Sequence, residues 1–283
     1  VILFTVHPIC TQAVAWCSGL GYPLSLVWAG AILNLIPWVY DNPCMTNVLL
    51  GTLGFCLLQF LAIHAQFATM MLWVIFLFFG WWHFAILGFL MSVVMGFDII
   101  CQTIKLRRNE FIKQNMAKSI YVNLRKTIVA LKTLIYYLAH SLVPATIGLY
   151  HTWGFHYDTS IERKDWHFGL GFLAFIGLIG IYFLHPVIEV KLSILWFVSF
   201  VFIFLNWITI QQFVTERYVF LPTIGTCLLI SYVTQDYLVA YAFIVGIYLC
   251  RTWLILPAYD NELRFYQSNV WNFPNSEVAY GNL

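Results

Sequence analysis

The sequence predicts an all-α polytopic membrane protein with a polar segment at its C-terminal end. Of the 283 residues, 61% are hydrophobic and only 9% are charged, and the mean hydropathy is +0.82. Soluble domains carry about 25% charged residues, so this composition is typical of a chain that lies largely in lipid. Apolar runs of about 20 residues, the length of a helix that crosses a bilayer, recur along the chain.

The apolar runs predict a multi-pass membrane domain over residues 1–258. They fall at residues 20–39, 46–65, 67–97, 130–149, 169–188, 192–210, 219–235 and 238–257. The run at 67–97 is too long for one upright span. It predicts either a tilted or kinked helix, or one span followed by a partial one.

A basic loop at residues 98–133 separates the third run from the fourth. Between Lys105 and Lys132 it holds eight Lys and Arg residues and a single acid, Glu110. The excess of positive charge predicts a cytoplasmic loop. A topology determinant that includes an amphipathic surface helix explains these charges, so we expect no nucleic-acid partner.

Alternation from this loop assigns sides to the other loops, if residues 67–97 cross the membrane once. Most polar residues outside the basic loop then lie on the extracytoplasmic face, among them His7, Thr11, Gln12, Glu216 and Arg217. Their convergence predicts a site at the outer membrane boundary. Two crossings at 67–97 would move the N-terminal loops to the opposite side.

The two ends of the sequence predict that this chain is a piece of a longer protein. Residues 1–6, "VILFTV", look like the end of an apolar helix. Residues 259–283 are polar and aromatic, and Pro274 followed by Tyr280-x-x-Leu283 is typical of the junction between tetratricopeptide repeats. We therefore expect residues 259–283 to be the extracytoplasmic start of a helical repeat region.

Three segments, in this order, resemble the transmembrane and tetratricopeptide-repeat-containing O-mannosyltransferases and their bacterial relatives. They are "LFTVHPICTQAVAW" at 3–16, "ERYVFLPTIG" at 216–225 and "NELRFYQSNVWNFPNSEVAYGNL" at 261–283. The resemblance implies a GT-C-like helical bundle followed by a tetratricopeptide-repeat domain. It also implies transfer of a sugar from a polyprenyl-phosphate donor to an extracytoplasmic acceptor.

The resemblance places the catalytic carboxylate in a loop before the first residue of this chain, so no catalytic base is nominated here. Cys10, Gln12 and Leu20 stand where the family pattern has His, Glu and Arg. These departures favour a second hypothesis, a non-catalytic membrane scaffold or subunit that presents extracytoplasmic helical repeats to a partner complex.

The candidate site residues follow from the chemistry of a phosphate leaving group, on which negative charge builds as the glycosyl bond breaks. Arg217 offers a permanently charged planar fork to phosphate oxygens, and we assign His7 and Tyr218 to the donor phosphate with it. Glu216, Thr11 and Gln12 form a supporting polar site. The alternatives are that Glu216 and Arg217 are a structural pair, and that His7 is an interfacial hydrogen-bonding residue.

The resemblance also defines the expected cofactor, partners and location. A divalent cation is left open as a cofactor, and no residues are assigned to a metal. The expected partners are membrane lipid, a polyprenyl-phosphate-linked sugar and a protein that either accepts the sugar or binds the repeats. The membrane would be the plasma membrane in a prokaryote and the endoplasmic reticulum in a eukaryote.

Overall fold

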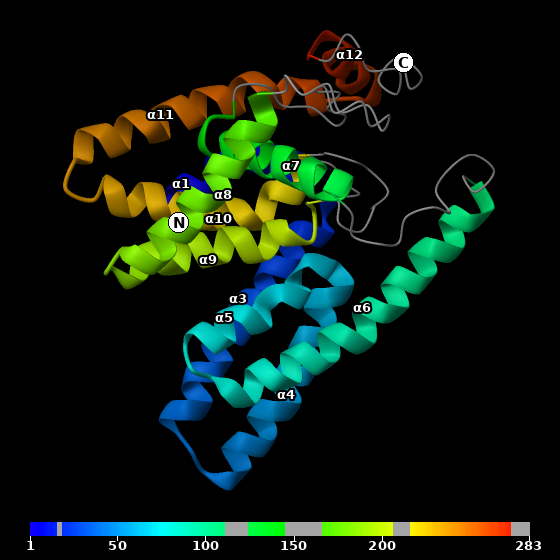
Figure 1. Ribbon diagram of the computed structural model, residues 1–283, viewed down its shortest axis with the longest axis vertical. Helices are drawn as coiled ribbons and strands as arrows, with labels where there is room; N and C mark the ends of the chain where they lie inside the picture. Colours follow the sequence, from blue (N-terminus) through cyan, green and yellow to red (C-terminus); the bar gives the residue numbers. More distant parts are fainter. Residues whose placement is uncertain (16–18, 111–123, 145–165, 206–215, 273–283) are drawn as a thin grey trace. The chain divides into compact units, whose positions relative to one another are not determined.

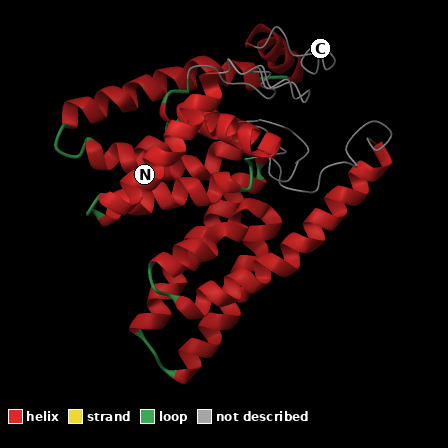
Figure 2. Ribbon diagram, viewed as in Figure 1, coloured by secondary structure: helices red, strands yellow, loops and turns green. Residues whose placement is uncertain are grey.

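The computed structural model describes residues 1–15, 19–110, 124–144, 166–205 and 216–272. Every regular element within these ranges is a helix (Figures 1 and 2). The chain forms two compact units, each described below by itself. One unit comprises Val1–Gly19 and Tyr121–Leu283, and we call it the discontinuous unit. The other comprises Leu20–Ile120, and we call it the continuous unit.

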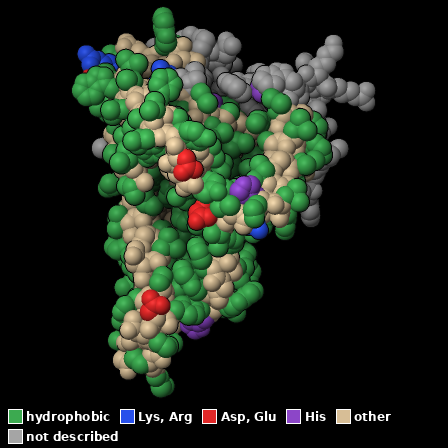
Figure 3. Space-filling model, turned by 90° about the vertical axis from the view of Figure 1, so that its left-hand side faces the viewer, with side chains coloured by type: hydrophobic (Ala, Val, Ile, Leu, Met, Phe, Trp, Pro, Cys, Tyr) green, Lys and Arg blue, Asp and Glu red, His purple; other side chains and the backbone are tan. Residues whose placement is uncertain are grey.

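Among the described residues, four helices are long and apolar enough to cross a membrane. They are α3 (Gly21–Asp41), α4 (Met45–Ala65), α8 (Trp166–Leu184) and α11 (Leu238–Ile255). In α8 and α11 only 6% of the span is buried inside the molecule, and the face drawn in Figure 3 is largely hydrophobic. Such exposed apolar surface is unfavourable in water, so these helices indicate a membrane protein.

The predicted run at 67–97 is broken in the structure. It folds as the 3₁₀ helix η2 (Phe67–Met71) and α5 (Leu72–Phe78), followed by α6 (Trp82–Glu110). Gly80 makes the turn between them with a φ of 75°, a conformation that glycine adopts without strain. Of the two possibilities open from the sequence, the structure therefore matches a short partial helix next to a longer one.

Within the continuous unit, α4 and α6 run in the same direction. The hydroxyl oxygen of Thr52, in the first half of α4, lies 3.1 Å from Nε2 of His83 at the start of α6. Ser92, further along α6, donates a hydrogen bond of 2.8 Å to the Met70 carbonyl, close to the end of α4. Because η2 and α5 connect the end of α4 to the start of α6, residues 67–97 do not form one continuous helix, and their crossing of the membrane stays a prediction. Alternation from the basic loop therefore no longer assigns a side to residues 7–19.

In the discontinuous unit, α9 (Ile188–Phe202) packs closely against α10 (Phe220–Val233). The Trp196 indole N–H donates to the Leu221 carbonyl at 2.9 Å. A Cβ atom on Gly225 would lie 2.5 Å from the Ser193 carbonyl oxygen, so the two backbones meet at this glycine. Small residues allow the same close approach between helices in membranes generally.

The first 15 residues of the chain pack inside the discontinuous unit as two short helices, α1 (Ile2–Thr5) and α2 (Pro8–Ala15). Leu3 forms a buried apolar cluster with Cys227 of α10 and Tyr248 of α11. Helix α2 contacts α11, the 3₁₀ helix η4 (Glu216–Val219) and the 3₁₀ helix η5 (Leu256–Tyr259). After η5 the chain continues into α12 (Glu262–Asn272). The predicted repeat junction at residues 274–283 lies outside the described residues.

The packing at Gly225 predicts the effect of a single methyl group. We expect Gly225→Ala to lower the free energy of unfolding by about 1–3 kcal/mol, because backbone atoms of α9 occupy the space for the new Cβ. Gly246→Ala in α11 is the matched control, since nothing lies within 4 Å of its Cβ position. That control should be neutral or stabilising by up to about 1 kcal/mol. Unfolding in detergent micelles measures both, and equal effects would contradict the packing.

Candidate functional site

The candidate site is built around the C-terminal end of α7 (Leu124–Leu142), where the last carbonyl groups have no partner within the helix. The Ser141 carbonyl lies 3.1 Å from Nε2 of His7 and 3.3 Å from the Thr226 hydroxyl of α10, which also lies 3.0 Å from the Thr223 carbonyl of its own helix. The Leu142 carbonyl accepts one from the Tyr248 hydroxyl of α11 at 2.6 Å. Side chains of three segments therefore satisfy the end of α7.

His7 is held at both of its ring nitrogens. Nδ1 accepts a hydrogen bond from the Ile9 amide at 3.2 Å, so Nε2 carries the proton that is donated to Ser141. The ring is 1% exposed and meets the Tyr248 ring edge-on, with centroids 4.5 Å apart. Burial lowers the pKa of His7 from 6.5 to about 4, partly offset by the Ser141 hydrogen bond. This neutral, fully engaged ring fits a residue that holds α2 in place better than one that grips a phosphate.

A hydrogen bond from α11 also holds the segment that leads into α2. Thr252 donates to the Val6 carbonyl at 2.8 Å, directly before His7 and the helix-breaking Pro8. Pro8 begins α2, where its missing N–H leaves no bond unmade. The orientation of α2 therefore depends on contacts to both α7 and α11.

Helix α2 carries two buried side chains whose polar atoms make no hydrogen bond. Thr11 is 6% exposed and Gln12 is 2% exposed. Within the described part of the chain, neither the Thr11 hydroxyl nor either end of the Gln12 amide has a partner. A buried polar group without a partner costs about 1–3 kcal/mol, so these atoms are placed to meet something other than the described protein groups.

The 3₁₀ helix η4 brings the other predicted site residues to the same region, because it contacts both α2 and α7. Arg217 is half-buried, and its guanidinium carbon lies 5.8 Å from the centroid of the Tyr218 ring. Tyr218 is 5% exposed and stacks on Phe204 at a centroid distance of 4.3 Å. Glu216 begins η4, and its side chain lies outside the described ones.

The structure thus brings together two segments that are about 200 residues apart in sequence. One carries His7, Thr11 and Gln12, and the other carries Glu216, Arg217 and Tyr218. Whether these residues bind a donor phosphate stays a prediction. Within the described residues no group of three or more His, Cys, Asp or Glu side chains could hold a metal ion.

Sequence reasoning missed the residues that fix this arrangement, namely Ser141, Thr226, Tyr248 and Thr252. Each lies in or at the end of an apolar helix, where a hydroxyl group gives no sign of its partner. Thr226 and Tyr248 fall in the middle of the apolar runs at 219–235 and 238–257, so their positions in the sequence give no signal of this role.

Comparisons with protein-family models, with curated proteins and with solved structures found no match. The interpretation of the site therefore rests on its residues and their geometry.

Two threonines allow the same substitution to be compared with and without a hydrogen bond. Thr226 is buried, and its hydroxyl has two backbone acceptors, the carbonyls of Thr223 at 3.0 Å and Ser141 at 3.3 Å, so we expect Thr226→Val to lower the free energy of unfolding by about 1 kcal/mol. Thr11 is also buried, but among the described residues its hydroxyl has no partner. Thr11→Val should therefore be neutral or stabilising in the protein without ligand. Chemical denaturation of both variants tests this, and a larger loss for Thr11→Val would refute the proposed difference.

The lowered pKa of His7 predicts an acid sensitivity. As the pH falls below about 6.5, the unfolded chain takes up a proton at His7 and the folded protein does not, so the free energy of unfolding decreases until pH 4 is reached. A shift from 6.5 to about 4 corresponds to a loss of roughly 3 kcal/mol at most.

His7→Gln isolates this contribution, because it keeps an amide donor near the position of Nε2 and does not titrate. Stability measured against pH should fall less steeply between pH 6.5 and 4 in the variant than in the native protein. Parallel curves for the two proteins would show that His7 is not the titrating group.

Proposed function

We propose that this chain is part of a membrane glycosyltransferase-like protein that takes a sugar from a polyprenyl-phosphate donor and passes it to an extracytoplasmic acceptor. The observation that carries the proposal is the packing of α2 against η4. Helix α2 carries the unpartnered groups of Thr11 and Gln12, and it contacts the segment that carries Arg217.

The residues divide by chemistry. Arg217 is the phosphate ligand, because its guanidinium keeps its charge and binds two phosphate oxygens at once. A sugar hydroxyl both donates and accepts hydrogen bonds, and the amide of Gln12 offers one acceptor and two donor hydrogens that the described protein leaves unused. His7 positions α2 and does not contact the donor. No residue of this chain is proposed as the catalytic base.

A separate argument for the side of the site uses α7, whose apolar part, Thr127–Leu142, is shorter than the four candidate spans, and it does not use the broken run at 67–97. Lys113 and Lys118 precede this helix, and Arg125 and Lys126 lie in its first turn. By the positive-inside rule, these charges support a cytoplasmic position for the start of α7. Its far end, at Ser141 and Leu142, lies in the candidate site. If α7 crosses the membrane, the site is extracytoplasmic, where a lipid-linked sugar would meet a secreted or lumenal acceptor.

A scaffold that presents the polar tail to a partner complex is the second candidate function. The observation that favours it is the full engagement of His7 by backbone groups, which gives that residue a purely structural role. In a scaffold, Thr11 and Gln12 would be solvated by water, and substitution of Arg217 would leave complex formation unchanged.

Donor binding distinguishes the two functions. We expect Arg217→Ala to weaken binding of a polyprenyl-phosphate sugar by about 10-fold or more, because a charge-assisted pair of hydrogen bonds is lost. Arg264→Ala is the matched control. Arg264 is exposed on α12 and pairs with Asp260 at 2.7 Å, outside the candidate site.

The binding measurement uses the purified protein in detergent with a labelled donor lipid, followed by transfer assays on the full-length protein. Loss of affinity in Arg217→Ala alone supports the transferase. Equal affinity in both variants would remove Arg217 from the site, and absence of donor binding in the native protein would leave the scaffold as the function.

A further inference from the structure

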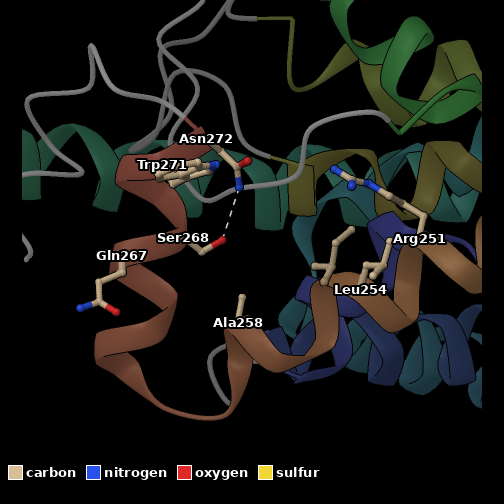
Figure 4. Close-up of a pocket in the computed structure, with 8 residues that line it drawn as sticks. Arg251, Leu254, Ala258, Gln267, Ser268, Trp271 and Asn272 are labelled. Carbon is tan, nitrogen blue, oxygen red and sulfur yellow. Dashed lines mark hydrogen bonds between the residues drawn. The ribbon is translucent and has the colours of Figure 1, made fainter.

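We assign no ligand to the hollow between α11 and α12 (Figure 4). The Asn272 amide donates to the Ser268 hydroxyl at 3.4 Å, and Arg251 also has interactions within the protein. Polar groups of its wall are therefore already engaged.

Four aromatic side chains lie at one end of the continuous unit, where α3 ends and α6 begins (Figure 1). The Trp81 ring stacks on Tyr40 at a centroid distance of 6.3 Å and on Phe79 at 4.9 Å. Trp38 and Tyr40, in the last turn of α3, are each 46% exposed, and Trp82 is 64% exposed. We call Trp38, Tyr40, Trp81 and Trp82 the aromatic cluster.

The aromatic cluster has polar atoms that the described protein does not use. Within the described part of the chain, neither its indole N–H groups nor the Tyr40 hydroxyl forms a hydrogen bond to a protein group. Beside the cluster, Nε2 of the exposed His83 lies 3.1 Å from the Thr52 hydroxyl, which adds polar groups at this level of the helices. Such rings are enriched at membrane–water boundaries, because their apolar faces meet acyl chains and their polar edges meet headgroups.

Polar and aliphatic side chains lie on opposite sides of the aromatic cluster along the helices. Asp41, directly after Tyr40, is the only Asp, Glu, Lys or Arg in residues 1–97. The connection that it opens is exposed as far as Met45. In the other direction along the helix axes, α4 exposes Leu53 and α6 exposes Ile86. The rings therefore separate a polar turn from an aliphatic surface.

The lengths of the helices beyond the cluster fit a bilayer. Along α6 the first charged residue is Asp98, which lies 16 residues after Trp82, or about 24 Å along a helix. Along α3, 17 residues separate Trp38 from Gly21 at the start of the helix, or about 26 Å. Both lengths approach the thickness of the hydrocarbon core, which is about 30 Å.

We propose that the aromatic cluster binds the headgroup region of a phospholipid bilayer and fixes the depth of α3 and α4 in it. The indole N–H groups and the Tyr40 hydroxyl donate to lipid phosphate and ester oxygens, and the ring faces lie against the first methylene groups of the acyl chains. Asp41 then stays in water. A bilayer fits this surface better than a second protein does, because a bilayer presents the same order of polar, interfacial and aliphatic layers.

This role is independent of the proposed transferase reaction, which uses Arg217 at η4 and the polar groups of α2. Failure of one proposal therefore leaves the other intact.

The test measures the depth of two tryptophans of α3 in the purified chain, reconstituted into phosphatidylcholine vesicles. Lipids that carry bromine near the headgroup or near the bilayer centre quench nearby indole fluorescence, and Trp38→Phe and Trp28→Phe give each ring's contribution by difference. Trp28 is the matched control, because it is partly exposed on the same helix and lies ten residues, or about 15 Å, from Trp38. We expect shallow bromines to quench Trp38 and deep bromines to quench Trp28, with depths that differ by about 15 Å.

Two native cysteines of α4 give a second measurement that needs no substitution. Cys44 caps the start of α4 in the exposed turn, and Cys56 is partly exposed 12 residues further, about 18 Å along the helix. A charged, water-soluble maleimide on both sides of the vesicles should modify Cys44 about tenfold faster or more, because the reactive thiolate does not form in hydrocarbon. Peptide mass mapping identifies the modified residue, and unfolding in SDS should make both cysteines react.

Equal depths for Trp38 and Trp28, or equal rates of modification for Cys44 and Cys56 in vesicles, would overturn the proposed boundary. If neither brominated lipid quenches Trp38, another protein surface covers the aromatic cluster, and the assignment to a bilayer is wrong.

Discussion

The carbonyl groups of Ser141 and Leu142, at the end of α7, are the constraint on which the candidate site depends. In apolar surroundings an unsatisfied carbonyl costs several kcal/mol, so these two groups must find donors from outside their own helix. The donors come from His7, Thr226 and Tyr248. Three segments, two of them the consecutive helices α10 and α11, therefore meet at one helix end, and His7 ties the start of α2 to it.

The position of α2 explains how a helix of eight residues contributes to function. The helix contacts η4 and carries Thr11 and Gln12, which are buried and whose polar atoms make no hydrogen bond to the described protein groups. The protein stability lost by burying these groups is recovered only when a ligand or water meets them. His7 and Arg217 have different tasks in the proposed function: His7 holds the backbone, and Arg217 would bind the donor phosphate.

The all-α class and the apolar helices could be predicted from the sequence, because composition and run length depend on no distant contact. The joining of the "HPICTQ" and "ERY" segments was also predicted, but by an argument that counted one crossing at 67–97. The turn at Gly80 interrupts the helix on which the count of one crossing depended. The contact between α2 and η4 brings the two segments together without that argument. The bond between His7 and Ser141 spans 134 residues and could not be predicted, since one sequence does not show which carbonyl a buried histidine meets.

The central claim is that α2 and η4 form one binding site, and a double-mutant cycle tests it most directly. Binding of a polyprenyl-phosphate sugar would be measured for Gln12→Met, Arg217→Ala and the double variant. Residues that hold one ligand together are coupled, so the loss in the double variant should differ from the sum of the single losses by about 0.5 kcal/mol or more. Strictly additive losses, or no loss from Gln12→Met, would contradict a shared site.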